Sequence, residues 1–120
     1  MLIFKEIRFD ATHFLPKVPE GHACSHLHSH AFTIQIHVVG DIDPAAGWVM
    51  DFAALSQAVK PIIDQLDHHC LNEISGLENP TCEMLTRWIW TRLHPLIPGL
   101  TKLVLKETPD AGCVFQGEHC

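Results

Sequence analysis

The most informative stretch of this chain is residues 9–36, FDATHFLPKVPEGHACSHLHSHAFTIQI. It begins and ends with alternating apolar and polar residues, the pattern of a half-buried β-strand. Between the two alternations lies a segment rich in Pro, Gly and His, residues 16–25, which we expect to form a loop. Strand parity places His13 on the apolar face of the first strand, and His28 and His30 on the apolar face of the second.

The rest of the chain extends this pattern to two strands, two helices and two more strands. We expect strands at residues 2–14, 30–39, 101–108 and 113–116, and helices at residues 51–66 and 79–94. Asp51 suits the N-cap of the first helix, which Pro61 should kink or split. Asn79 and Pro80 suit the N-cap and first position of the second helix. The order β-β-α-α-β-β favours an α+β fold, in which two helices pack on one face of a four-stranded antiparallel sheet.

Composition narrows the classes of function. The chain has 120 residues, 47% of them hydrophobic and 18% charged, so we expect one globular domain over residues 1–120. Its formal net charge of -6 disfavours general binding to nucleic acid or to an anionic membrane. No apolar run approaches the ~20 residues of a membrane span. The N-terminus lacks the pattern of a signal peptide, so we expect a cytoplasmic protein.

The three histidines on apolar strand faces predict a metal site. His28 and His30 are two residues apart on one strand and point the same way, and His13 from the neighbouring strand end can complete three corners of a tetrahedron. Zn²⁺ favours this ligand set, and three protein ligands leave a position open for substrate. The alternative is that these are core histidines bonded to the backbone. His26 and, less favourably, His22 are rival ligands.

Cys24 lies four residues before His28 and has three possible roles. A metal ion and several histidines should lower the pKa of its thiol below the free value of ~8.5, which suits a nucleophile or a base. It could equally be a fourth zinc ligand, which would make the site closed and purely structural. Cys70 and Cys113 lie in apolar stretches, so we expect both to be inert core residues, and we expect no chemistry from Cys120 at the chain end.

Two acidic residues, Asp67 and Glu107, are further candidates for the functional site. Asp67 and His68 are adjacent and could exchange protons near neutral pH, provided that a turn rather than a helix brings them together. The alternative is that the histidines lie at the C-terminus of a helix only because positive charge interacts favourably with the helix dipole there. Glu107 lies on the apolar side of its strand, where a carboxylate needs a partner with two parallel N–H donors. An arginine, a pterin or a guanine would serve, unless the side chain simply faces water.

Together these residues fall in five segments whose order and spacing identify a family. The segments are FDATHFLPKVPEGHACSHLHSHAFTIQI, GWVMDF, LDHHCLNE, ENPTCE and LKETPDAGC. From Phe4 to Gly117 the chain resembles the 6-pyruvoyl-tetrahydropterin synthase family. Its short length and PEGHxC segment are most similar to the bacterial 6-carboxy-5,6,7,8-tetrahydropterin synthases of queuosine biosynthesis.

The resemblance implies a tunnelling fold (T-fold), whose subunits join their sheets into trimers that stack as a homohexamer. It also assigns roles by position: metal ligands at His13, His28 and His30; catalytic residues at Cys24, Asp67 and His68; a pterin anchor at Glu107; and a pocket lining at Thr81 and Cys82. It implies that Asp67 and His68 act across a subunit boundary. The family usually has Gly where this chain has Ser29, which an extended strand should tolerate.

The resemblance further implies a Zn²⁺-dependent lyase. Its substrate would be 7,8-dihydroneopterin triphosphate, and its products 6-carboxy-5,6,7,8-tetrahydropterin, acetaldehyde and triphosphate. One alternative is a 6-pyruvoyl-tetrahydropterin synthase, which eliminates triphosphate without cutting the side chain. Another is a non-catalytic domain held together by structural zinc. Family members that divert the substrate towards folate tend to carry Glu near the position of Cys24, so this residue argues against that branch.

Overall fold

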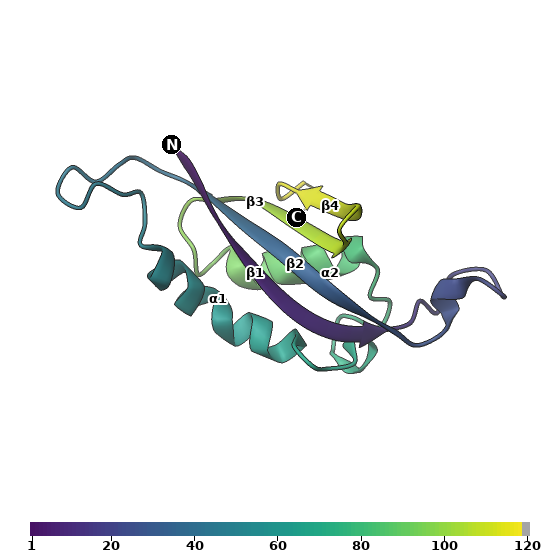
Figure 1. Ribbon diagram of the computed structural model, residues 1–120. Helices are drawn as coiled ribbons and strands as arrows, with labels where there is room; N and C mark the ends of the chain where they lie inside the picture. Colours follow the sequence, from purple (N-terminus) through teal and green to yellow (C-terminus); the bar gives the residue numbers. More distant parts are fainter. Residues whose placement is uncertain (119–120) are drawn as a thin grey trace.

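The computed structural model describes residues 1–118 and contains one antiparallel sheet (Figure 1). Strands β1 (Leu2–His13) and β2 (His28–Val39) form a long pair that aligns His13 with His28. Strand β3 (Leu100–Thr108) pairs with β2, and β4 (Ala111–Phe115) pairs with β3, which gives the order β1-β2-β3-β4. The predicted four-stranded antiparallel sheet is confirmed. Cys120 lies outside the described residues.

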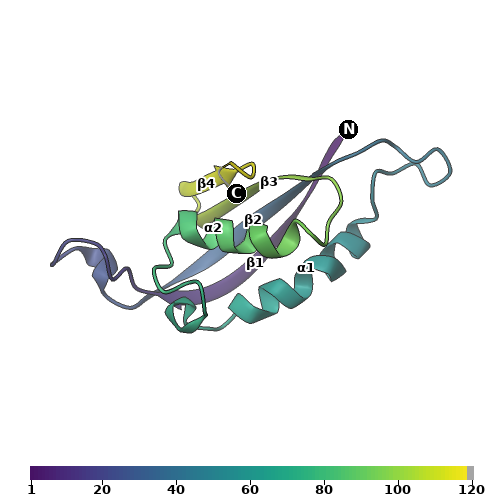
Figure 2. The ribbon, with the colours of Figure 1, turned by 180° about the vertical axis from the view of Figure 1, so that it is seen from behind.

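Two helices cover one face of this sheet, as predicted (Figure 2). They are α1 (Phe52–Leu66) and α2 (Cys82–Leu93). Between sheet and helices lies a core of aliphatic and aromatic side chains, which includes the predicted stripe Leu85, Trp88, Ile89 and Leu93. Neither helix within residues 1–118 combines the length and apolar character needed to cross a membrane.

Helix α1 begins where the sequence places it. The carboxylate of Asp51 accepts a hydrogen bond from the backbone N–H of Ala53 at 3.0 Å, the expected N-cap. The prediction that Pro61 splits the helix is wrong, because α1 continues without a break to Leu66. Pro61 removes the hydrogen bond to the carbonyl of Gln57, but both residues are exposed, so water can replace that bond.

Helix α2 begins later than predicted. Its N-cap is Thr81, whose hydroxyl accepts a hydrogen bond from the N–H of Met84 at 3.1 Å, and not Asn79. Pro80 therefore lies outside the helix. Since its carbonyl oxygen is not used by the helix, it accepts a hydrogen bond from Nδ1 of His13 at 2.8 Å. The corrected boundary thus contributes to the functional site.

Candidate functional site

Three histidines meet where β1 ends and β2 begins. The rings of His13 and His28 are 4.6 Å apart between centroids, and the ring of His30 lies 5.1 Å from His13 and 4.9 Å from His28. One nitrogen from each ring lies within 4.8 Å of the others. His13 is 1% exposed, whereas His28 and His30 are half-buried, so the cluster opens to solvent on one side.

Backbone carbonyls orient two of these rings. Nδ1 of His13 donates to the carbonyl of Pro80 at 2.8 Å, and Nδ1 of His28 donates to the carbonyl of His26 at 2.7 Å. Because a carbonyl can only accept, the proton of each neutral ring is held on Nδ1, and Nε2 keeps its lone pair. This outer-shell arrangement is typical of metal-binding histidines.

The cluster fits a metal ion on chemical grounds. Within residues 1–118, Nε2 of His13 is buried and has no hydrogen-bond partner, which is costly for a polar atom. Burial is also the main reason that the pKa of His13 lies below its ordinary value, so the ring favours the neutral form that ligates metals. Three imidazoles and an open side suit Zn²⁺ with a free coordination position.

Neither rival histidine joins the cluster in the described part of the chain. His22 caps a short 3-10 turn, Ala23–Ser25, where its Nδ1 accepts a hydrogen bond from the N–H of Cys24 at 3.0 Å. His26 contributes only its carbonyl, to His28, and its side chain is exposed.

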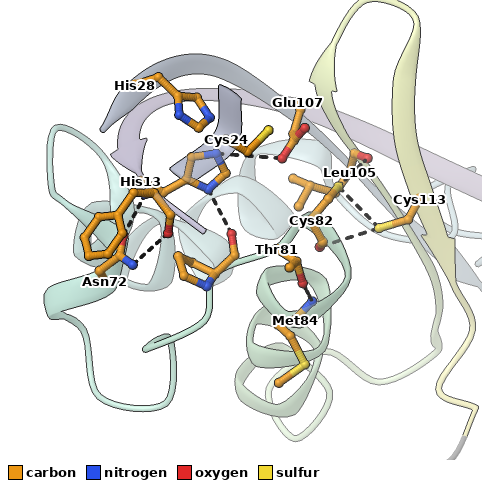
Figure 3. A network of polar contacts seen from close by, with 12 residues as sticks. His13, Cys24, His28, Asn72, Thr81, Cys82, Met84, Leu105, Glu107 and Cys113 are labelled. Carbon is orange, nitrogen blue, oxygen red and sulfur yellow. Dashed lines mark hydrogen bonds and ion pairs between the residues drawn. The ribbon is translucent and has the colours of Figure 1, made fainter. Parts of the chain in front are cut away.

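Glu107 reaches the cluster from β3. Its Oε1 lies 3.8 Å from Nε2 of His13, and its side chain is 26% exposed (Figure 3). The prediction that Glu107 simply faces water is therefore not supported. A half-buried carboxylate beside the open side of a three-histidine cluster can accept two hydrogen bonds from a ligand bound there.

Cys24 lies in the loop that joins β1 to β2. Its carbonyl accepts a hydrogen bond from the N–H of Leu15 at 2.8 Å, which ties the loop back to the end of β1. In Figure 3 its thiol and the Glu107 carboxylate are seen on the same side of the His13 ring. Cys24 does not belong to the close group of ligand atoms found among residues 1–118. The thiol is half-buried and free.

Asn72 is a structural support that the sequence analysis did not single out. Its side chain accepts from the N–H of Phe14 at 3.0 Å and donates to the carbonyl of the same residue at 2.8 Å (Figure 3). This pair of hydrogen bonds fixes the backbone directly after His13. The only sequence signal was the position of Asn72 inside the LDHHCLNE segment.

Asp67 and His68 form the predicted pair, but at the outer edge of β1. Helix α1 ends at Leu66, His68 has a left-handed backbone with φ of 61°, and its Nδ1 lies 3.0 Å from Oδ2 of Asp67. The N–H of Asp10 donates to Oδ1 of Asp67 at 2.9 Å. That hydrogen bond is the main cause of a pKa for Asp67 below its ordinary value.

The Asp67–His68 pair does not meet the three-histidine cluster within one chain. His68 lines a separate depression of about 310 Å³, which includes Ser29 on the sheet face opposite to His28 and His30. At the beginning of α2, the Thr81 hydroxyl is engaged in capping, and the Cys82 thiol lies 3.6 Å from the carbonyl oxygen of Leu105.

Comparison with known proteins shows what this site is similar to. Residues 2–118 match the model of the 6-pyruvoyl tetrahydropterin synthase family. A 6-carboxy-5,6,7,8-tetrahydropterin synthase of Synechocystis sp. is 38% identical over 113 residues, which are 89% of this chain and 86% of that protein. A dihydroneopterin monophosphate aldolase of Pyrococcus furiosus is 39% identical over 95 residues, which are 79% of this chain and 76% of that protein.

A solved structure shares the fold. The 6-pyruvoyl tetrahydropterin synthase of Caenorhabditis elegans superposes with a TM-score of 0.89 at 22% sequence identity, covering 98% of this chain and 95% of that one. The sheet order and the two helices on one face are those of the tunnelling fold, as the sequence predicted.

Proposed function

The chain belongs to the 6-pyruvoyl tetrahydropterin synthase family, and we propose that it is a zinc-dependent carbon–carbon lyase. Its substrates are 7,8-dihydroneopterin triphosphate and water, and its products are 6-carboxy-5,6,7,8-tetrahydropterin, acetaldehyde and triphosphate, in the cytoplasmic route to queuosine. The observation that carries this proposal is that the Glu107 carboxylate lies beside the three-histidine cluster, 3.8 Å from Nε2 of the buried His13. Similarity to the Synechocystis enzyme supports the choice of product.

His13, His28 and His30 hold the metal in this proposal. The orphaned Nε2 of His13 supports it, as do the two carbonyls that keep Nε2 free on His13 and His28. A Zn²⁺ ion held there supplies Lewis acidity to oxygens of the substrate side chain and so makes neighbouring protons easier to remove. The absence of Cys24 from the close group of ligand atoms in residues 1–118 favours an open site over a closed structural one.

Glu107 positions the substrate. A pterin presents its 2-amino group and N3–H as two parallel donors, and a carboxylate accepts both at once. That pairing fixes the orientation of the pterin ring beside the open side of the three-histidine cluster. Thr81 and Cys82, at the beginning of α2, line the pterin pocket in this arrangement.

Cys24 transfers protons. As a thiolate it removes a proton from the substrate side chain and returns it elsewhere, which lets the side chain be oxidised while the pterin ring is reduced. No separate redox cofactor is required. General acid–base help of this kind is typically worth ~10²–10⁴-fold in rate.

The Asp67–His68 pair completes the site from a neighbouring subunit. It lies at the outer edge of β1, away from the three histidines of its own chain, and its Nδ1–Oδ2 distance of 3.0 Å suits proton exchange. We propose that the chain forms a homohexamer of two stacked trimers, in which sheet edges join and bring this pair beside another subunit's Cys24. Unpaired strand edges favour such association.

The test is product identification by mass after zinc-loaded protein is incubated with 7,8-dihydroneopterin triphosphate. A 6-carboxy product with acetaldehyde supports the proposal. A 6-pyruvoyl product would move the chain to that branch, and a product of aldol cleavage would align it with the Pyrococcus relative. No turnover by folded, zinc-replete protein would favour a structural zinc domain.

Two variants separate catalysis from folding. Cys24→Ala is expected to keep its zinc and lose turnover by at least about 100-fold, because it removes a proton-transfer group and no metal ligand. Cys70→Ala is the matched control, since Cys70 is also a half-buried free thiol, and its turnover should stay close to that of the wild type. Loss of zinc from Cys24→Ala would contradict the open site.

A further inference from the structure

A pair of cysteines, Cys82 and Cys113, lies beside the site, and neither thiol takes part in the proposed proton transfer. Sγ of Cys82, the first residue of α2, is 3.5 Å from Sγ of Cys113 on β4 (Figure 3). Both residues are half-buried, so small molecules can reach them. The prediction that Cys113 is an inert core residue is therefore incomplete, because it omits this partner.

The surroundings of the pair favour a reactive thiolate. The Thr86 hydroxyl lies 3.0 Å from Sγ of Cys113. A hydrogen bond from the Cys82 thiol is the main cause of the lowering of the pKa of Cys113 to about 7, which burial partly opposes and the nearby Thr86 hydroxyl supports. The same contact raises the pKa of Cys82, so that Cys82 keeps its proton and acts as the donor. Thiolate, not thiol, is the nucleophile in cysteine oxidation.

The backbone holds the two sulfurs in place. Cys113 is paired with Leu105 in the β3–β4 ladder, and a Cβ on the neighbouring Gly112 would collide with the Leu105 carbonyl, so these strands approach unusually closely. Cys82 is fixed by the Thr81 cap of α2. A disulfide requires an S–S distance of ~2.05 Å, so the sulfurs must approach by about 1.5 Å from their present 3.5 Å.

That movement acts on the proposed site. Pro80, whose carbonyl holds the His13 ring, comes two positions before Cys82 in the chain. Glu107 comes two positions after Leu105, the partner of Cys113 in the sheet. Drawing α2 towards β4 would therefore act on the support of a histidine in the three-histidine cluster and on the strand that carries the carboxylate.

We propose that Cys82 and Cys113 are a redox modification site, which forms a reversible disulfide with hydrogen peroxide and thereby lowers turnover at the neighbouring site. The Cys113 thiolate attacks one peroxide oxygen, giving a sulfenic acid and hydroxide. The Cys82 sulfur then attacks the Cys113 sulfur, loses its proton, and the sulfenic oxygen leaves as water. In sum, two thiols and one peroxide give one disulfide and two waters, and a dithiol reductant reverses the change.

The experiment treats the full-length zinc protein with graded hydrogen peroxide, blocks the remaining thiols by alkylation, and maps linked peptides by mass spectrometry. We expect a Cys82–Cys113 link to form before Cys70 is oxidised, and dithiothreitol to remove it. Cys113→Ser should abolish the link, whereas Cys70→Ser should leave it unchanged. This readout does not depend on the reaction that the protein catalyses.

Turnover measured on the same samples tests the consequence, which rests on the proposed function. We expect a loss of at least about tenfold on oxidation, the cost of disturbing an outer-shell partner of a metal ligand, and recovery with dithiothreitol. In Cys113→Ser this reversible loss should disappear. The proposal would be overturned if Cys82 and Cys113 were each still alkylated, and so not linked, when Cys70 is already oxidised. An equal reversible loss of turnover in Cys113→Ser would also overturn it.

Discussion

Replacing Asn72 by alanine should weaken both the fold and the metal site. The side chain makes two hydrogen bonds to the backbone of Phe14, at 3.0 and 2.8 Å, in a partly buried position. Each is worth ~0.5–1.5 kcal/mol net, so Asn72→Ala should lower the free energy of unfolding by about 2 kcal/mol. At ~2.1 cal/mol/K of unfolding entropy per residue, that is a fall in Tm of about 8 °C for a chain of this size.

The effect should also reach the histidines, because Phe14 directly follows His13. We expect zinc affinity to fall by about tenfold, the lower end of the range for outer-shell changes. Thermal unfolding by circular dichroism at fixed protein concentration measures the first effect, and competition with a chromophoric chelator measures the second. Asn72→Asp keeps the oxygen that accepts from Phe14 N–H and loses the donor to its carbonyl, so it should be intermediate.

An Asn72→Ala protein with unchanged Tm and unchanged zinc affinity would refute this reasoning. A lower Tm with unchanged zinc affinity would show that the two Asn72–Phe14 hydrogen bonds support the fold without positioning His13. The exposed Thr91, whose hydroxyl donates to the Arg87 carbonyl on the surface of α2, gives the matched control. Thr91→Ala should change neither quantity appreciably, since exposed hydrogen bonds are readily replaced by water.

Three further outcomes are expected. Chelation of the metal should lower Tm, and added Zn²⁺ should restore it, because free zinc at 100 times its Kd stabilises the folded protein by ~2.7 kcal/mol. A Tm that does not respond to the chelator would contradict the metal site. The pKa of Asp67 is lowered in the folded state, mainly by the hydrogen bond from the Asp10 N–H. The Asp67 carboxylate therefore stabilises the fold fully above its pKa in the unfolded chain, and this stabilisation is lost as the pH falls through its pKa in the folded protein. The difference in Tm between the wild type and Asp67→Asn should therefore be largest near pH 6 and shrink below about pH 4. A difference that does not change with pH would show that the Asp67 carboxylate is not its cause. Gly112→Ala should cost about 1–3 kcal/mol in chemical denaturation, because its Cβ collides with the Leu105 carbonyl; a wild-type midpoint would show that the strands can separate freely.

The strand pairing that builds the cluster could be predicted because alternation is a local property. His13, His28 and His30 lie on the apolar faces of their strands. Any antiparallel pairing that buries the apolar faces of both strands brings the three histidines to the same side of the sheet. The same argument placed Glu107 with Leu103 and Leu105, two buried residues of β3.

The errors share one cause, which is competition between local preference and tertiary contacts. Asn79 and Pro80 have the residue types of a helix start, but the Pro80 carbonyl is engaged by a histidine distant in sequence, so the helix begins at Cys82. Pro61 should kink or split the helix, but burial of Ile62 and Ile63 directly after it keeps α1 continuous.

The amino-acid sequence alone determined the element order, the faces that are buried, and the chemical types gathered at the end of β1, because these follow from periodicity and residue chemistry. Only the tertiary structure decided which backbone carbonyls orient His13 and His28, that Asn72 clamps Phe14, and that Cys82 meets Cys113. Apart from the local contact between His28 and His26, these contacts join residues far apart in the chain, through carbonyls and sulfurs that carry no periodic signal. They exist only once the sheet and helices have packed, which is why folding rather than composition completes this site.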